Sequence, residues 1–168
     1  MKKIIAVALL SVCALSTSAN AATPKIGAVF PEIILKESKF AQAASKKINT
    51  EFAPRSAALA AQVEVIKQKS AALERDGPTL PEQQKVERQK EIADLDRAFQ
   101  KKQRDFEADL ETQKRAGIQT VLDLTNKVVM RIAKDEKYDF ILQNVVYSSP
   151  TANLTQQVIL EMDKEVAK

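Results

Sequence analysis

The chain has 168 residues with 26 Lys or Arg and 22 Asp or Glu, which gives a formal net charge of +4 at pH 7, and it contains no His, one Cys and three Gly. Without a His or a Gly-rich loop, and with its one Cys near the N-terminus, neither a nucleophile–base pair nor a phosphate cradle can be assembled by the usual routes. The acidic residues also lack the spacing of a Ca²⁺-binding loop. We therefore expect a protein that is not an enzyme, with no cofactor and no metal ion.

The first 21 residues have the pattern of a secretory signal peptide. Two lysines precede an apolar run over residues 4–15, and residues 19–21 read Ala-Asn-Ala, which predicts cleavage before Ala22 and export of the remainder. Cys13 lies inside the apolar run. A lipoprotein attachment at Cys13 is disfavoured, because Val12 is bulky where that signal has a small residue and the Ala-Asn-Ala site lies downstream.

Cleavage leaves a nearly neutral chain without cysteine. Removing the two lysines of the signal leaves 24 basic residues against 22 acidic ones, a net charge of +2, with both signs interleaved. A nucleic-acid-binding domain concentrates Lys and Arg on one face and usually adds stacking aromatics, so we expect no nucleic acid partner. No disulfide can form, and no later stretch is long and apolar enough to span a membrane.

The exported chain begins with a short β segment and a short helix. Residues 25–30 read Lys-Ile-Gly-Ala-Val-Phe, which favours a strand. Pro31 ends the strand and suits the first turn of a helix over residues 32–37. A much longer helical pattern starts at about Phe40.

Residues 44–136 predict two long helices. Large apolar residues recur there at steps of three, four and seven, which is the spacing of one helix face. The pattern is interrupted once, at Asp-Gly-Pro-Thr-Leu-Pro over residues 76–81. The apolar positions are Ile48, Phe52, Leu59, Val63, Ile66 and Leu73 before the break, and Val86, Ile92, Leu95, Phe99, Phe106 and Leu110 after it.

These positions predict the seam of an antiparallel helical hairpin that turns at Thr79. Residues that face each other across such a hairpin lie equally far from its turn. Five pairs satisfy this condition for Thr79, and a sixth, Leu73 with Val86, misses it by one residue. The five are Ile48 with Leu110, Phe52 with Phe106, Leu59 with Phe99, Val63 with Leu95, and Ile66 with Ile92.

The hairpin, residues 44–114 with its tip at 77–81, should form a long and pliable arm. Each helix has about 33 residues and reaches roughly 50 Å at 1.5 Å per residue. Ser56 and Ser70 stand near seam positions where a tight coiled coil has Leu. Pro54 removes a helical hydrogen bond, and the resulting kink is either a tolerated bend or a device that bows the arm into a concave wall.

The second helix continues beyond the arm, so its last third is expected to pack into a body. Gly117 lies at this transition, opposite Ala41 by symmetry about Thr79. It either permits close helix contact, which we favour, or softens the helix into a hinge at a cost of about 1 kcal/mol relative to Ala. The apolar stripe of this last third is Val121, Leu124, Val128 and Ile132.

The C-terminal part mixes short strands with a final helix. Alternating apolar residues over 137–148 predict a β-hairpin, and residues 152–154 can add a brief strand. Thr155 can cap a terminal helix whose apolar residues are Val158, Ile159, Met162 and Val166. Residues 22–43 and 115–168 thus form an α/β body. So few short strands bury too little apolar surface to anchor such an arm alone, so we expect bodies to associate.

Four segments spread along the chain carry a family resemblance. They are residues 25–29 (Lys-Ile-Gly-Ala-Val), 51–55 (Glu-Phe-Ala-Pro-Arg), 137–142 (Lys-Tyr-Asp-Phe-Ile-Leu) and 145–155, which begin Val-Val-Tyr-Ser-Ser-Pro and end Leu-Thr. In this order, with the signal peptide and the hairpin, they resemble the Skp/OmpH family of periplasmic chaperones. The resemblance implies a homotrimer whose strand-built body carries three helical arms around a cavity. It further implies a periplasmic chaperone that holds unfolded outer-membrane β-barrel proteins without ATP.

The resemblance also bears on a basic face of the second arm helix. Family members are proposed to bind lipopolysaccharide there, and Lys102 aligns with one such position. The paired arginines further along are replaced by Thr112 and Gln113. A solvated charged face is therefore favoured over a contact for lipopolysaccharide or an anionic membrane surface. The candidate residues are Lys101, Lys102, Lys114 and Arg115.

A holding function is physically sensible, since exported barrel precursors expose apolar strand faces that aggregate in water. Alanines of the first arm helix can offer weak apolar contact, although Ala is also simply a good helix former. The alternative function is a structural coiled-coil spacer or envelope adaptor, which needs a well-filled seam. The two seam serines, together with Pro54 and Gly117, favour pliable arms instead.

Overall fold

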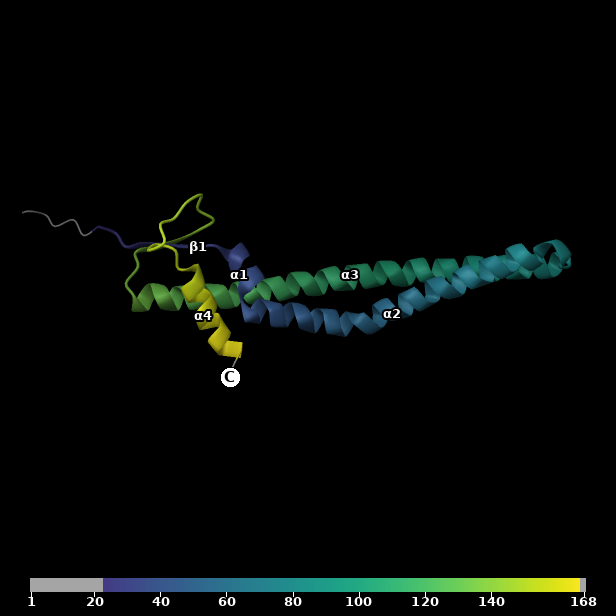
Figure 1. The fold of residues 1–168 in the computed structure, drawn as a ribbon, viewed down its shortest axis with the longest axis horizontal. Coiled ribbons are helices and arrows are strands. Elements are labelled where there is room, and N and C mark those ends of the chain that lie inside the picture. Colours follow the sequence, from purple (N-terminus) through teal and green to yellow (C-terminus); the bar gives the residue numbers. More distant parts are fainter. Residues whose placement is uncertain (1–22, 167–168) are drawn as a thin grey trace, which may run out of the picture.

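The computed structural model describes residues 23–166 and consists of a long helical arm on a small body (Figure 1). Helices account for most of these residues, and one two-stranded sheet lies in the body. The fold is therefore mainly α with a small β body, as the sequence predicts. The elements are β1 (Ile26–Val29), α1 (Pro31–Glu37), α2 (Lys39–Asp76), the 3-10 turn η1 (Gly77–Thr79), α3 (Glu82–Asp135), β2 (Phe140–Gln143) and α4 (Thr155–Val166). The signal-peptide prediction for residues 1–21 lies outside the described residues.

The arm reverses at a tip where prolines separate its two helices. α2 ends at Asp76 because Pro78 cannot supply a further helical N–H. The hydroxyl of Thr79 closes the turn by donating to the carbonyl of Asp76 at 2.8 Å. Because α3 starts directly after Pro81, the reversal occupies residues 77–81, where the sequence places the tip.

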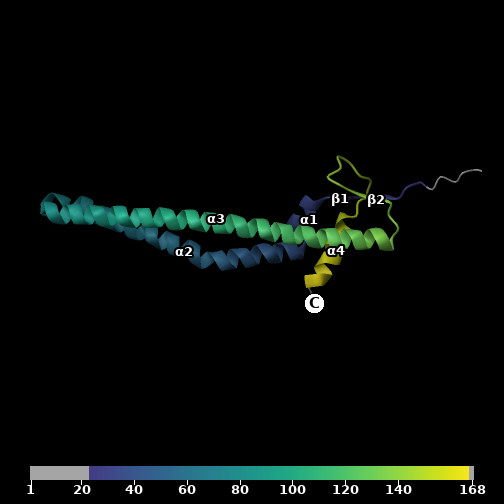
Figure 2. The same ribbon diagram turned by 180° about the vertical axis from the view of Figure 1, so that it is seen from behind.

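α2 is one continuous helix across Pro54, yet it bows away from α3 between the body and the tip (Figures 1 and 2). Pro54 has no N–H for the carbonyl of Thr50, and its ring crowds the preceding turn, so the helix bends there. Toward the tip the two helices approach again. The bend therefore shapes the middle of the arm.

The body sheet places β1 between two later segments of the chain. β1 and β2 run parallel, with Ile26 opposite Phe140 and Val29 opposite Gln143. On the other side of β1, Ala28 forms a parallel bridge with Asn153. Parallel neighbours need a long crossover connection, and here the entire arm is part of the connection from β1 to β2. The sheet thus joins both ends of the arm in one body.

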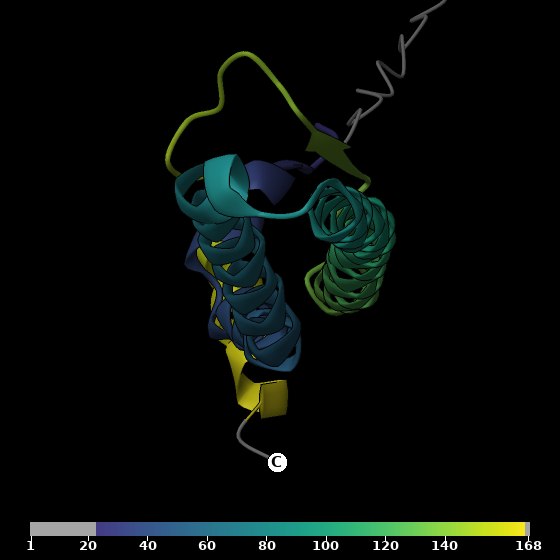
Figure 3. The ribbon, with the colours of Figure 1, turned by 90° about the vertical axis from the view of Figure 1, so that its right-hand side faces the viewer.

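The predicted β-hairpin over residues 137–148 is wrong. β2 ends at Gln143, Asn144 has a left-handed φ of 55°, and residues 144–151 form a loop outside the sheet. This loop arches over the two long helices in the view along the arm (Figure 3). Alternating apolar residues indicate a strand but not its partner, and the partner of β2 is the distant β1. The expected strand at 152–154 is reduced to a single bridge.

The core lies where α1 and α4 pack on the last third of α3. Its side chains come from every element of the body, and the predicted apolar stripe of α3 supplies Val121, Val128 and Ile132. Thr125 is buried among them, and its hydroxyl donates to the carbonyl of Val121 at 2.8 Å. The other buried core residues include Val29, Ile34, Leu154, Val158, Ile159 and Met162.

Side chains of the terminal region fasten the start of the arm to the body. Ser38 caps α2 by accepting from the N–H of Ala41 at 3.2 Å. The carboxylate of Asp163, on α4, accepts from the N–H of Lys39 at 2.8 Å, where a negative charge also suits the helix dipole. Thr155 begins α4, but its hydroxyl accepts from the N–H of Phe30 at 3.1 Å instead of capping its own helix. Ser38 and Asp163 thus fix the start of α2, whereas Thr155 ties the end of β1 to α4.

Candidate functional site

The described residues favour extended surfaces over a compact chemical site. Within residues 23–166, no group of three or more His, Cys, Asp or Glu side chains is placed to hold a metal ion. Over the same residues, no helix is sufficiently long and apolar to cross a membrane. The candidate functional regions are therefore the arm, the cleft at its bend and the exposed edge of the body.

Most of the twelve predicted seam residues are less exposed than their neighbours on the arm. Phe52 is buried, Val86 near the tip is 52% exposed, and the other ten are half-buried: Ile48, Leu59, Val63, Ile66, Leu73, Ile92, Leu95, Phe99, Phe106 and Leu110. The rings of Phe52 and Phe106 meet edge-to-face, with centroids 5.7 Å apart and an interplanar angle of 64°. Such pairs contribute about 0.5–1.5 kcal/mol beyond the area they bury. This aromatic pair is the best-packed point of the arm.

Most polar contacts across the arm depart from the register symmetric about Thr79. Arg55 on α2 pairs with Asp109 on α3 at 2.9 Å. Lys102 on α3 donates to the side-chain oxygen of Gln62 on α2 at 3.2 Å. In both cases the α3 residue lies farther from the tip than its α2 partner.

Side-chain direction accounts for the offset. Helical side chains lean toward their own N-terminus, so those of α2 lean toward the body and those of α3 toward the tip. Two side chains that meet across the arm therefore belong to residues at different distances from the tip. The register from equal distances holds for Phe52 and Phe106. Near the body it pairs Gly117 with Ala41, but Gly117 lies against Ile48. A Cβ built on Gly117 comes 3.0 Å from the Ile48 Cδ1 atom.

The bend in α2 leaves a cleft between the arm helices, which we call the kink cleft. Its volume is about 350 Å³. At its body end the Arg55 guanidinium lies over the rings of Phe52 and Phe106, 5.3 and 5.6 Å from their centroids. The kink cleft is lined by Arg55, Ala58, Leu59, Gln62, Lys102, Asp105 and Phe106.

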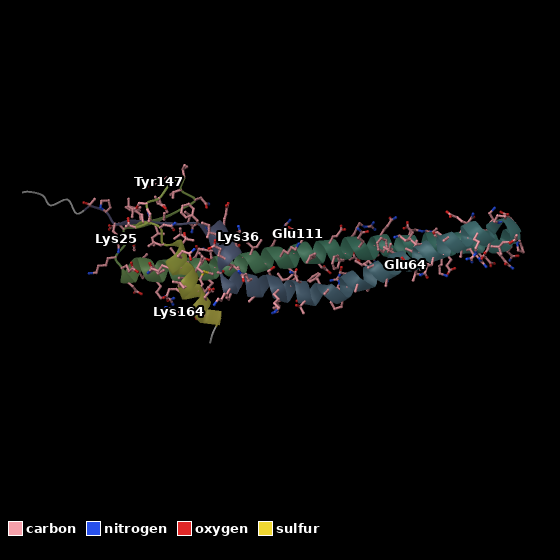
Figure 4. All side chains as sticks on the ribbon, in the orientation of Figure 1. Lys25, Lys36, Glu64, Glu111, Tyr147 and Lys164 are labelled. Carbon is pink, nitrogen blue, oxygen red and sulfur yellow. The ribbon has the colours of Figure 1, made fainter. Side chains whose placement is uncertain are left out.

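The four basic residues proposed from the resemblance do not form one cluster. Lys102 reaches the kink cleft, whereas Lys114 lines a separate cavity beside Ile48 at the root of the arm. These two residues lie about 18 Å apart along α3. Arg115 pairs with Glu111 at 2.9 Å, and Lys101 is exposed. Acidic side chains such as Glu64 and Glu111 also lie along the arm (Figure 4), so basic and acidic side chains are interleaved there.

The body carries an exposed apolar region at the outer edge of β2. Within residues 23–166, no strand pairs with this edge. Phe140 is 58% exposed, and Val146 and Tyr147 stand almost fully in solvent on the loop that follows (Figure 4). Ile26 and Leu142 add further exposed apolar surface. The sequence predicts that Val146 and Tyr147 lie in a strand and does not predict their exposure on a loop. The signal for an apolar surface there is the apolar character of these two residues.

The tip of the arm carries a carboxylate held in its ionised form. Asp76 accepts from Arg75 at 2.8 Å and from Arg88, across the turn on α3, at 3.4 Å. The hydrogen bond from Arg75, and the weaker contribution of Arg88, hold the pKa of Asp76 below its ordinary value. The ion pair with Arg88 thus joins the ends of α2 and α3.

These features define a class of protein: a two-helix arm without an enclosed site, mounted on a body whose parallel sheet has an open apolar edge. The family model described as "Outer membrane protein (OmpH-like)" matches residues 25–162, and the chain belongs to this family of Skp/OmpH chaperones.

Individual proteins agree with this assignment. The chain is 27% identical over 165 residues to the chaperone protein Skp of Photorhabdus luminescens, a match that covers 96% of this chain and 99% of the relative. The chaperone protein Skp of Photorhabdus laumondii subsp. laumondii matches to the same extent. A crystal structure of an OmpH-like outer membrane chaperone from Caulobacter crescentus has a TM-score of 0.76 over 86% of each chain, at 16% identity. This last similarity concerns the fold alone.

Proposed function

We propose that this protein is a periplasmic holding chaperone, without enzymatic activity, that keeps unfolded outer-membrane β-barrel proteins from aggregating until they reach the membrane. The observation that carries the proposal is the arm. It is long, it has a single buried aromatic contact, and it exposes small apolar and mixed-charge surface on both helices. Such a surface suits many weak contacts with a chain that has no fixed shape.

Holding by weak contacts requires several arms on one particle. Contacts that are linked act at a high effective concentration, so a set of weak ones can hold tightly. The open edge of β2, with Phe140 and Leu142 exposed beside it, is a template for pairing with another subunit. We therefore propose a homotrimer joined through the bodies, with its arms around the client.

No nucleotide is needed for this mechanism. Release follows when the client folds into the membrane, because a folded barrel no longer offers apolar strand faces to many arm contacts at once. A structural spacer needs no release step, since its arms keep a fixed reach and bind no client.

The test is dilution of a urea-unfolded outer-membrane β-barrel protein into buffer with and without the protein of residues 22–168. Light scattering should stay low at stoichiometric chaperone and should be unchanged by added ATP. Mass by light scattering should give three subunits at micromolar concentration. Aggregation equal to that of the client alone excludes the holdase and leaves the spacer, and a requirement for ATP excludes the mechanism.

A further inference from the structure

The kink cleft has a specific structural cause and is not a gap that runs along the whole arm. It lies where Pro54 bends α2 away from α3, directly on the tip side of the Phe52–Phe106 contact. Of the four α2 residues that line it, Arg55, Ala58, Leu59 and Gln62, Ala58 has the smallest side chain and leaves space open. The lining left open is apolar and comes from Ala58, Leu59 and part of the Phe106 ring.

The charged side chains around the kink cleft differ in whether they already have an ion-pair partner. Arg55 is neutralised by Asp109 at 2.9 Å. Lys102 donates to the neutral amide of Gln62 at 3.2 Å, and within residues 23–166 neither Lys102 nor Asp105 has an ion-pair partner within 4.0 Å. An ammonium group and a carboxylate therefore stand at the rim with hydrogen-bonding capacity for a ligand.

We propose that the kink cleft takes one large apolar side chain of an unfolded polypeptide, with Lys102 facing a backbone carbonyl and Asp105 facing a backbone N–H beside it. A volume of about 350 Å³ lies at the lower end of the range for ligand pockets, about 300–1,000 Å³, and admits an aromatic or branched side chain. A peptide backbone offers one donor and one acceptor per residue, which matches a rim with one group of each kind. This inference rests on the proposed function and gives it a preferred contact.

An anionic lipid fits the kink cleft less well than a polypeptide. Its headgroup phosphate has no donor for Asp105, and the carboxylate repels it. Another cavity in the outer half of the arm is lined by Glu87, Lys90, Glu91 and Asp94 beside Leu95. The kink cleft has three apolar residues in its lining, Ala58, Leu59 and Phe106, whereas that cavity has Leu95 alone.

Single cysteines provide a probe that leaves the kink cleft open, because Cys is close to Ala in size and residues 22–168 contain no other thiol. The Ala58→Cys variant places a thiol in the cleft, and Ala57→Cys places one on the neighbouring exposed position. Each variant is alkylated with iodoacetamide, with and without a urea-unfolded outer-membrane β-barrel protein. We expect the client to slow alkylation roughly tenfold for Ala58→Cys and less than twofold for Ala57→Cys.

Protection from aggregation is measured in the same samples, so that the two proposals can fail separately. If the protein prevents aggregation normally and the client slows alkylation of both thiols equally, the proposal for the kink cleft is rejected and the holdase proposal stands. Absence of protection and of slowing overturns both. Phosphatidylglycerol vesicles replace the client in a further arm, and selective slowing of Ala58→Cys by vesicles alone assigns the cleft to a lipid and rejects the proposal. If N-acetylphenylalaninamide slows alkylation of the Ala58→Cys variant selectively and N-acetylalaninamide does not, the proposal is supported.

Discussion

The body and the arm are stabilised in different ways, although α3 runs through both. In the body, α1, α4 and the end of α3 enclose side chains such as Ile34, Val158 and Met162, which have no exposed surface. In the arm, residues 44–114, Phe52 is the one buried hydrophobic residue. The body thus has a core of its own, whereas the arm has a half-buried seam between two helices.

Under the proposed holding function, the difference separates two tasks within one chain. A packed core specifies a single arrangement, which suits a body that must position the arm and present a fixed edge. A seam with few buried contacts opens locally at low free-energy cost, which suits a surface that adapts to unfolded clients. The following changes test whether this division is real.

Truncation of a buried body residue should have the largest effect on stability. Ile34→Ala removes a side chain with no exposure from the core, so the free energy of unfolding should fall by about 2–5 kcal/mol. The matched arm variant, Leu59→Ala, starts half-buried and should cost about 1 kcal/mol. Denaturant unfolding at one fixed protein concentration measures both. Equal losses would contradict the division between body and arm.

Shortening the arm should instead act on function while the body stays assembled. Removing residues 64–70 together with 88–94 takes one heptad from each helix at equal distances from Thr79, so the remaining seam positions keep their spacing. Fewer contacts per arm should weaken aggregation protection severalfold through lost effective concentration. Scattering with the unfolded client gives the protection, and mass by light scattering reports the assembly. A dissociated oligomer would show that the arm contributes to association.

A matched control for this deletion is a single exposed substitution on the same helix. Ala61→Ser changes one contact among many, so protection should remain within about twofold of the unchanged protein. Loss of protection from this variant alone would indicate a discrete site in place of distributed contacts.

Replacing glycine by alanine should change the free energy of unfolding in opposite directions in the body and at the tip of the arm. In Gly27→Ala, the new Cβ meets the Leu154 Cδ1 atom at 2.6 Å and the Tyr138 ring at 3.2 Å, so crowding should destabilise the body by about 1–3 kcal/mol. Gly77 has helical φ and ψ of −50° and −39°, with no atom near a new Cβ. Gly77→Ala should therefore stabilise the tip by about 0.4–1 kcal/mol. Thermal unfolding distinguishes the signs, and destabilisation by both variants would refute the contrast.

The arm was largely predictable from sequence because its determinants are local. Helical periodicity, the prolines around Thr79 and the equal distances from that turn depend on residues close to one another along each helix. The pairing of Phe52 with Phe106 followed directly. The offset of Arg55 with Asp109 and of Gln62 with Lys102 did not, since it depends on side-chain direction and reach. The kink cleft also escaped prediction, although Pro54 marked its place.

The body was less predictable because its sheet joins segments far apart in the chain. β1 and β2 are separated by the whole arm, and the pattern of residues 138–147 is the same for a local or a distant partner. The use of Thr155 to bind Phe30 was hidden for the same reason. Burial of Val158 and Met162 was foreseen, because helical periodicity is again a local signal.

The smallest effect concerns pH at the tip of the arm. Hydrogen bonds from Arg75 and Arg88 hold the pKa of Asp76 below its ordinary value, so the folded tip favours the ionised carboxylate. The contribution to stability is therefore complete above the ordinary carboxyl pKa and is lost as the pH falls below about 4. Backbone amide shifts of residues 74–88 should move between pH 6 and pH 2 as the ends of α2 and α3 loosen. Asp76→Asn should reduce this dependence, and Asp94→Asn, whose ion pair with Arg97 lies within α3, should leave it intact. An identical titration in the Asp76→Asn variant would assign the change to another carboxylate and show that the tip is not joined through Asp76.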